Sequence, residues 1–412
     1  MKFNKWTLGL AAVGAVSMAS AVRADEAKMS QLNTALSNTT ISGYVDVAAQ
    51  YNPGNQPGRD PIYIGSGSVS GIPANNIVNS ARKVDNFSLN DVNITIDKPL
   101  DDSPWAAGYH IDLNAGHDAF NALNFDANAA GTGIGGGLGG VQAQSTLVGI
   151  RQAYVTMRTP VGNGIDWKFG AMDGVTGYEG NTDYSNPNYT RSYGYAVNPA
   201  LMVGIMGSYK VCNEVTVQLG LVNRGETFAA GGQNQSNLSS KDYVATVALT
   251  APDSWGFLKG SSLIFGAVQG FDNQSVGNYN VSATLNTPVT GLKVGLAYDV
   301  VTTSAGQNVG APSVGDGSIY GVYATYQATD KLSFNLRGEY VDAADLGLFT
   351  SNGVGCKGEE LTATVEYDLW ANVVTRAEFR WDHAEKGSDF ATATGNSTES
   401  YYTLALNVIY KF

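Results

Sequence analysis

Apolar and polar side chains alternate along most of the chain. In the segment 331–342, Leu332 and Leu336 fall on one side of an extended chain, and Arg337 and Glu339 fall on the other. Because successive side chains of a β-strand point to opposite faces, a period of two predicts strands with one apolar and one polar face. The same pattern recurs up to the last residues of the chain, so we expect an all-β fold.

Sixteen segments carry this alternation, each roughly ten residues long. At about 3.3 Å per residue and a tilt near 45°, a strand of that length crosses the hydrocarbon layer of an outer membrane. We therefore expect a transmembrane antiparallel β-barrel of about 16 strands, with 14 or 18 as alternatives. The segments are 41–51, 86–98, 105–115, 146–158, 165–173, 200–210, 214–223, 241–250, 261–271, 278–287, 291–303, 318–328, 331–342, 359–369, 372–382 and 400–412.

Short and long connections alternate between these segments. The short ones carry the Pro, Gly, Asn and Asp of tight turns, and the longer ones are 52–85, 116–145, 174–199, 224–240, 272–277, 304–317, 343–358 and 383–399. Short turns on one side and long loops on the other are typical of bacterial outer-membrane barrels. A secreted β-sandwich also alternates. Here, however, the apolar faces end in aromatic rings and the polar faces carry both signs of charge, which favours a lipid-facing band around a wet interior.

The first residues predict export. A positively charged start is followed by a mostly apolar stretch, and Val22 and Ala24 suit the −3 and −1 positions of a cleavage site, with Ala21 as the alternative end. The expected organisation is a signal peptide at 1–24, a short periplasmic segment at 25–40 that is either helical or frayed, and the barrel at 41–412. The expected location is the bacterial outer membrane.

Composition excludes several classes of protein. Charged residues make up 15%, with 50 Gly and 22 Tyr, and the formal net charge is −12. A soluble domain usually carries about 25% charged residues, and a nucleic-acid-binding protein needs a basic face. The chain contains no run of about 18 apolar residues, which is the length that a helical membrane span needs. An acidic excess that reached the interior of a pore would favour cations.

No catalytic or metal-binding grouping emerges, so we expect neither an enzyme nor a cofactor. Gly131, Gly133 and Gly136 satisfy G-x-G-x-x-G, but no strand precedes them and no helix follows, which favours a surface loop. No spacing suits a Ser/His/Asp nucleophile or a zinc site. The three histidines are His110, His117 and His383. Cys212 falls in a short turn and Cys356 in a long loop, on opposite sides of the expected membrane, which predicts two free thiols.

The segment 148–195 carries the most specific motifs. Its run RQAYV…TPVGNG…FG…GYE…NPNYTRSYG, together with the earlier TTISGYVD, resembles the putative β-barrel porin family that contains OmpL-like proteins. The motifs lie between residues 39 and 199, and the strand rhythm extends over most of the chain. Where that family has K-x-G-K-F after the VGNG turn, this chain has KFGAMDG. Lys168 is kept, and Ala171 or Met172 stands at the second Lys position. The resemblance implies a pore-forming barrel.

The connection 174–199 is the third long one, and it is dense in tyrosine. In sixteen-stranded general porins the third loop folds inward, and by analogy we expect this one to narrow the lumen. The alternative is an external loop held by its own Tyr and Asn contacts. The expected constriction residues are Glu179, Asp183, Arg191, Tyr178 and Tyr189. The charges expected to face the lumen are Arg151, Lys168, Arg337, Glu339, Arg376, Glu378, Arg380 and Asp382.

The expected function is passive diffusion of small hydrophilic solutes or ions through a water-filled barrel. The expected partners are outer-membrane lipid and the solutes, and we expect no binding to nucleic acid. A homotrimer is typical of sixteen-stranded porins. The outward faces of the strands are apolar all round the barrel, however, so the sequence does not show which of them would form a subunit interface. One alternative is a structural or surface-interaction barrel with a closed lumen, in which 52–85 and 116–145 bind a partner. A second is a secreted carbohydrate-binding β-protein.

Overall fold

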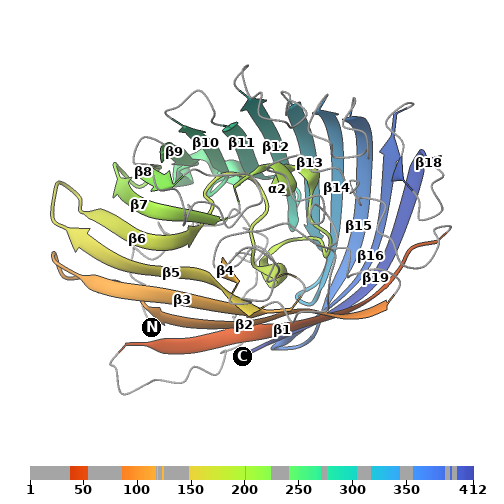
Figure 1. Cartoon of the computed structure of the whole chain (residues 1–412), viewed down its shortest axis with the longest axis horizontal. Helices are drawn as coiled ribbons and strands as arrows, with labels where there is room; N and C mark the ends of the chain where they lie inside the picture. The colour runs from red at the N-terminus through yellow and green to blue at the C-terminus, as the bar shows by residue number, and fades with distance from the viewer. Residues whose placement is uncertain are drawn as a thin grey trace.

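In the computed structural model the chain forms one closed ring of antiparallel strands (Figure 1). The structure describes residues 38–53, 86–116, 118, 123–124, 148–199, 201–223, 241–270, 276–303, 317–343, 356–385, 390–391 and 397–412. The expected leader 1–24 lies outside the described residues. So does the expected segment 25–40, except for its last three residues, where Thr40 begins the first strand.

Sixteen long strands make up the described part of the ring. They are β1 (Thr40–Tyr51), β2 (Asn86–Lys98), β3 (Ala107–Ala115), β5 (Val148–Thr159), β6 (Ile165–Asp173), β7 (Leu201–Lys210), β8 (Val215–Asn223), β9 (Lys241–Thr250), β10 (Ser262–Gly270), β11 (Val276–Asn286), β12 (Leu292–Thr303), β13 (Gly317–Gln327), β14 (Leu332–Ala343), β15 (Cys356–Trp370), β16 (Val373–Ala384) and β19 (Ser400–Lys411). Three two-residue strands, β4 (Leu123–Asn124), β17 (Phe390–Ala391) and β18 (Ser397–Thr398), complete the described strands. The prediction of a sixteen-stranded antiparallel barrel is confirmed.

The ring closes between the first and last long strands. β1 pairs antiparallel with β2 on one side and with β19 on the other. The last residue of the chain takes part, because Gly43 and Phe412 exchange two backbone hydrogen bonds of 3.0 Å. Each of the sixteen long strands is therefore paired on both sides, which removes the template for pairing with other chains along the described ring.

The two faces of the barrel differ as the alternation predicts. Along β19, Leu404, Leu406 and Val408 are exposed, whereas Ala405 and Asn407 between them are buried. The burial pattern of β13 alternates in the same way. The outer surface is therefore an apolar band, and the polar positions of the strands face the interior. Among the described residues, no helix is long and apolar enough to cross a bilayer.

The short connections lie at one end of the barrel, here called the short-turn end, and the longer ones at the other, the long-loop end. The turn between β5 and β6 uses Gly162 and Gly164, with φ of 59° and 93°, a conformation that glycine adopts without steric cost. Cys212, in the turn between β7 and β8, is exposed and free. Cys356 begins β15 at the long-loop end. Most of the glycine-rich connection 116–145 lies outside the described residues.

Two β-bulges change which side chains point inward. Asn90 is an extra residue of β2, because Asp46 of β1 pairs with Asp91 and the next residue of β1 pairs with Leu89. Arg151 is the extra residue of β5 opposite β3. A bulge lets two successive side chains point to the same face. Both members of each pair, Asn90 with Asp91 and Arg151 with Gln152, are buried.

Candidate functional site

The segment 174–199, which follows β6, lies inside the ring of strands (Figure 1). It contains the short helices η3 (Asp183–Ser185) and α2 (Tyr193–Val197). Asn188 and Tyr193 have no exposed surface, and Thr190 is 1% exposed. We call 174–199 the inner segment. Together with the strands it packs against, it forms the candidate functional site, since it occupies part of the interior of the barrel.

Two polar side chains shape the inner segment locally. Asn186 accepts a hydrogen bond from the backbone N–H of Gly180 at 2.9 Å and donates to the carbonyls of Gly180 and Thr182 at 2.8 and 2.9 Å. Ser192 caps α2, because its hydroxyl accepts from the N–H of Tyr195 at 2.9 Å. Such local bonds to the backbone are why Asn and Ser favour turns and helix N-caps. The inner segment therefore contains a turn that ends at Asn186 and a single helical turn that begins after Ser192.

Charged side chains form rows across the inner faces of β14, β15 and β16. The strand register places Arg337 opposite Thr362, and Thr362 opposite Arg380. The adjacent row consists of Glu339, Glu360 and Asp382. Alternate positions on paired strands share a face, so the alternation brings all six side chains to the interior. We call this surface the charged wall, and it includes Glu366, Arg376 and Glu378 farther along β15 and β16.

Arg337 joins the charged wall to the inner segment. Its Nε and Nη2 donate to the two carboxylate oxygens of Glu360 at 3.1 and 3.2 Å. Its Nη1 donates to Oε1 of Glu179 at 2.8 Å and to the carbonyl of Thr190 at 2.7 Å. A guanidinium offers five N–H donors in a rigid fork. The fork therefore holds a carboxylate of the segment and a carboxylate of the wall at once.

Two glutamates of the charged wall each bind two successive backbone N–H groups of the inner segment. Glu378 accepts from Tyr189 at 2.5 Å and from Thr190 at 2.9 Å. Glu339 makes the same pair of contacts with the first two residues of α2, at 2.7 and 3.0 Å. A buried backbone N–H without a partner costs about as much as a lost hydrogen bond. These carboxylates therefore remove the main penalty for placing a loop inside the barrel.

Two arginines of β16 bind carbonyl groups of the same segment. Arg376 donates to the carbonyls of Asp183 and Asn186 at 3.1 and 2.8 Å. Arg380 donates to the carbonyl of Arg191 at 2.7 Å. The carboxylates of the wall thus accept from N–H groups, and its arginines donate to carbonyls. The charged wall is complementary to the backbone of the inner segment.

The three charged residues expected at the constriction lie in ion pairs. Glu179 is paired with Arg337 on the wall, and Asp183 is paired with Arg191 within the segment at 2.5 Å. Arg191 also lies over the ring of Tyr195, 5.4 Å from its centroid. Burial alone lowers the pKa of Arg191, but the adjacent Asp183 carboxylate outweighs it and raises that pKa above its ordinary value. These charges fasten the segment to itself and to the wall.

The two tyrosines expected at the constriction contact different parts of the ring. Tyr178 stacks on Tyr323 of β13, with ring centroids 4.1 Å apart. Burial raises the pKa of Tyr178 to about 12. Tyr189 packs with Ala48 of β1 and Ala405 of β19. The inner segment therefore spans the interior from β13 to β1.

Seven of the eight charged residues expected to face the lumen hydrogen-bond to the inner segment: Arg151, Arg337, Glu339, Arg376, Glu378, Arg380 and Asp382. Arg151 donates to Thr182 at 3.0 Å and to Asp173 at 2.6 Å, so it attaches the segment to β5 as well. Lys168 lies on the neighbouring strand, with its Nζ 4.8 Å from the centroid of the Tyr154 ring.

Asp299 is a site residue that the sequence did not single out. Asn198, which follows α2, donates to Oδ1 of Asp299 at 2.6 Å, and Asn280 donates to the same oxygen at 2.7 Å. A Cβ on Gly194 would lie 2.6 Å from Oδ2 of Asp299, so this approach requires glycine in α2. Asp299 is one of many polar residues at inward positions, and alternation alone does not tell which of them meets the segment.

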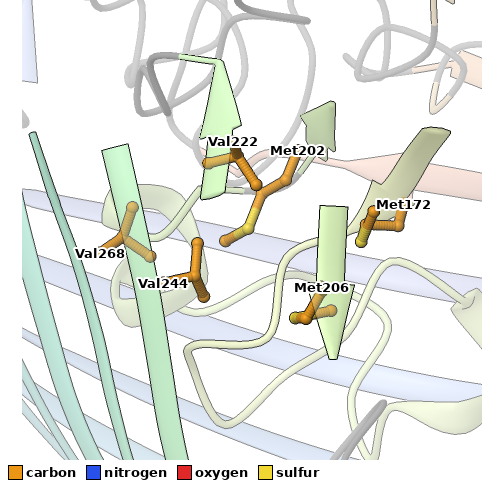
Figure 2. Close-up of a cluster of buried hydrophobic side chains, with 6 residues drawn as sticks. All are labelled: Met172, Met202, Met206, Val222, Val244 and Val268. Atoms are coloured by element: carbon orange, nitrogen blue, oxygen red, sulfur yellow. The ribbon is translucent and has the colours of Figure 1, made fainter. Parts of the chain in front are cut away.

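The inner faces of β6 to β10 carry an apolar cluster, which Figure 2 shows. Its members, each at most 2% exposed, are Met172, Met202, Met206, Val222, Val244 and Val268. Val175, near the start of the inner segment, and Tyr154 pack against it. The sequence predicted a polar interior, and this part of the wall is apolar. The contact with Val175 places the base of the segment on this side of the ring.

Metal-ligating side chains are not clustered in the described part of the chain. Among the residues described, no group of three or more His, Cys, Asp or Glu side chains is arranged to hold a metal ion. The ring nitrogens of His110 lie 2.9 Å from Asp97 and 3.1 Å from Asp112. Nδ1 of His383 is 3.0 Å from Oγ of Ser400. His117 and the glycines at 131, 133 and 136 lie outside the described residues.

Comparison with protein families gives one match. Residues 38–412 match the family model described as "Putative beta-barrel porin-2, OmpL-like". Comparison with curated protein sequences gives no match.

Solved structures with a similar fold include three outer-membrane proteins. OmpT of Vibrio cholerae in a trimer form has a TM-score of 0.53 and 13% identity, covering 91% of this chain and 99% of that one. The outer membrane channel DcaP of Acinetobacter baumannii has a TM-score of 0.52 and 12% identity, covering 91% and 97%. An anion-selective porin from Comamonas acidovorans has a TM-score of 0.52 and 12% identity, covering 91% and 99%. At these identities the likeness concerns the fold.

Proposed function

Because this chain belongs to the putative beta-barrel porin-2, OmpL-like family, we propose that it is a pore through which small hydrophilic solutes or ions diffuse passively across the outer membrane. Family and fold together support an outer-membrane barrel of the porin type. Its exposed apolar band faces lipid. In this function the chain acts by geometry and charge, as a channel rather than an enzyme.

The observation that carries the proposed function is the position of the inner segment. A ring of about 16 strands is wide enough to leave an aqueous channel, and residues 174–199 occupy part of that interior. We propose that this segment sets the aperture. Its expected constriction residues, Tyr178, Glu179, Asp183, Tyr189 and Arg191, act mainly by holding the segment in place, because each contacts the wall or a neighbour within the segment.

A closed barrel with a surface-interaction role is the second candidate, and one observation favours it. The inner segment contacts the ring on several sides. Thr182 contacts β5, Tyr189 contacts β1 and β19, and Tyr178 contacts β13. A segment attached so widely leaves less open area than a loop that follows one wall. The two candidates differ in whether ions pass.

Electrical recording from the purified protein in a planar bilayer tests the proposal. The protein is extracted from outer membranes in detergent, and its folded state is checked by heat-modifiable gel mobility. Reproducible current steps from the folded protein, and none after heat denaturation, are the expected result. Silence from a verified folded barrel would refute the pore and favour the closed barrel.

Two further proposals concern export and assembly. We propose that residues 1–24 are removed as a signal peptide and that the mature protein forms a homotrimer, as the similar OmpT structure does in its trimer form. An intact mass of the outer-membrane protein that begins at Asp25 would support the first, and a retained leader would refute it. Light scattering of the detergent complex measures the oligomer, and a protein mass equal to one chain would refute the trimer.

A further inference from the structure

The barrel interior holds many more buried carboxyl groups than buried guanidinium groups. Among the described residues, twelve Asp and Glu side chains are buried, against five Arg side chains. The carboxyl groups are Asp46, Asp91, Asp112, Glu179, Asp183, Asp242, Asp299, Glu339, Glu360, Glu366, Glu378 and Asp382. Each belongs to the inner segment or to the inner face of a strand. The excess of seven therefore lies inside the ring and not on its surface.

Partly exposed groups on the same inner faces reduce this excess without reversing it. Four further carboxyl groups face the interior: Asp97, Asp166 and Asp368 by the strand alternation, and Asp173, at the end of β6, by its hydrogen bonds with Arg151 and Asn181. The alternation also places five basic groups inward, and the inner segment adds a sixth: His110, Lys168, Lys210, Lys293, Lys411 and Arg191. With His110 counted as charged, sixteen carboxyl groups stand against eleven basic groups. Among these described groups, carboxyl groups exceed basic groups by five.

All five buried arginines have a carboxylate partner. The pairs are Arg151–Asp173 at 2.6 Å, Arg158–Asp166 at 2.6 Å, Arg337–Glu360 at 3.1 Å, Arg376–Glu366 at 2.8 Å and Arg380–Asp382 at 2.7 Å. Three of these arginines also lie beneath the inner segment. Their positive charge is thus cancelled at short range and screened from the remaining interior by the segment itself.

The inner faces of β1 to β3 carry carboxyl groups whose donors are mainly neutral. Oδ2 of Asp91 accepts from the hydroxyl of Tyr44 and from Nδ2 of Asn114, both at 2.7 Å. Oδ1 of Asp91 is buried and has no hydrogen-bond donor among the described residues. Asp112 accepts from Nε2 of Gln152 at 2.7 Å. Amide and hydroxyl donors bring no positive charge to these carboxyl groups.

The two cationic side chains nearest to these carboxyl groups are each shared with a second carboxyl group. Arg151 is 3.9 Å from Asp112 but only 2.6 Å from Asp173. His110 lies between Asp112 and Asp97, so one imidazolium faces two carboxylates. We call the inner-face groups Asp46, Asp91, Asp97 and Asp112 the acidic wall. It lies on strands other than those of the charged wall.

On the basis of the proposed function, we infer that this pore conducts small cations in preference to anions, with the acidic wall supplying the field. Fixed charges of one sign in a passage with low-dielectric walls raise the local concentration of counter-ions and exclude co-ions. The inner segment contributes by covering Arg337, Arg376 and Arg380, which would otherwise attract anions. Inorganic and small organic cations are the permeant class.

Reversal potentials across a bilayer that separates two KCl concentrations test the inference. We expect K⁺ to be at least about threefold more permeant than Cl⁻ at low salt, with the ratio falling as salt screens the wall. Steps that show equal permeability or a preference for Cl⁻ would overturn the inference and leave the pore intact. No steps from the folded protein would refute both the pore and its selectivity.

A pair of substitutions separates the acidic wall from the net charge of the protein. Asp97→Asn removes one charge from the wall at a side chain that is 35% exposed. Asp253→Asn removes one from a turn at the short-turn end, where the carboxylate is 83% exposed and pairs with Lys259. We expect D97N to lower the K⁺/Cl⁻ ratio and D253N to leave it unchanged. Equal ratios in D97N and wild type would overturn the role of the wall.

Discussion

Replacing Arg337 with methionine should release the inner segment from the charged wall. Methionine keeps most of the aliphatic stem but donates nothing to Glu179, Glu360 or the carbonyl of Thr190. The two carboxylates are fully buried, and removing one partner of a buried ion pair costs about 3–5 kcal/mol. Each 1.4 kcal/mol corresponds to about a factor of ten in an equilibrium constant. The equilibrium ratio of attached to released inner segment should therefore fall by roughly 10² to 10⁴.

Single-channel recording and limited proteolysis measure this change. The R337M variant should show larger or fluctuating current steps, and protease should cut within 174–199. Arg158→Met is the matched control, because Arg158 is also buried and ion-paired but donates to the carbonyl of Asp101 in a turn at the short-turn end. A folded R337M with the conductance and protease resistance of wild type and of R158M would refute this account of the attachment.

Three further substitutions test other contacts of the interior, and a labelling experiment tests the orientation of the barrel. Gly194→Ala, whose Cβ would crowd Asp299, should displace α2 and make the current noisier, and a quiet trace would count against the close approach. Glu378→Gln keeps the shape but turns one acceptor into a donor facing two backbone N–H groups; this should cost about 1–3 kcal/mol, seen as faster proteolysis of the inner segment, and unchanged proteolysis would argue against it. Both ring nitrogens of His110 face carboxylates, which only accept hydrogen bonds, so His110→Gln should remove a positive charge and raise the K⁺/Cl⁻ ratio; a fall in that ratio would contradict this. We propose that the short-turn end faces the periplasm, as short turns do in bacterial outer-membrane barrels. Exposed Cys212, in a variant without the other cysteine, should then react in cells with a bulky PEG-maleimide only after the outer membrane is opened, and labelling of intact cells would place the short-turn end at the cell surface.

The strand positions are predictable from the sequence because lipid outside and polar groups inside impose a period of two on every crossing. The expected segments 165–173 and 241–250 coincide with Ile165–Asp173 and Lys241–Thr250. The bulges are less evident, although the sequence contains a sign of them. Asn90 and Asp91 are adjacent polar residues within an alternating strand, as are Arg151 and Gln152, and each pair marks a bulge.

The charges of the site are predictable individually, but their partners are not. Alternation places Arg337 and Glu378 on the inner face, because both fall at polar positions of their strands. Their contacts join residues far apart in the chain: Arg337 and Glu179 are separated by 158 positions. No local pattern encodes such a pairing, and the path of the inner segment depends on many weak preferences acting together. The apolar inner face around Met202 was missed for the same reason, since its partner Val175 belongs to that segment.

The order of the chain gives the attachment of the inner segment a consequence for folding. The segment is synthesised well before its anchors, and Tyr189 precedes Glu378 by 189 residues. Contacts between such distant residues form late, because the entropy of closing a long loop must be overcome first. The anchoring strands β14 to β16 are the last long strands before β19, whose pairing with β1 closes the ring. Seating of the segment and closure of the ring therefore belong to one late, cooperative step, and a chain that stops short of β14 completes neither.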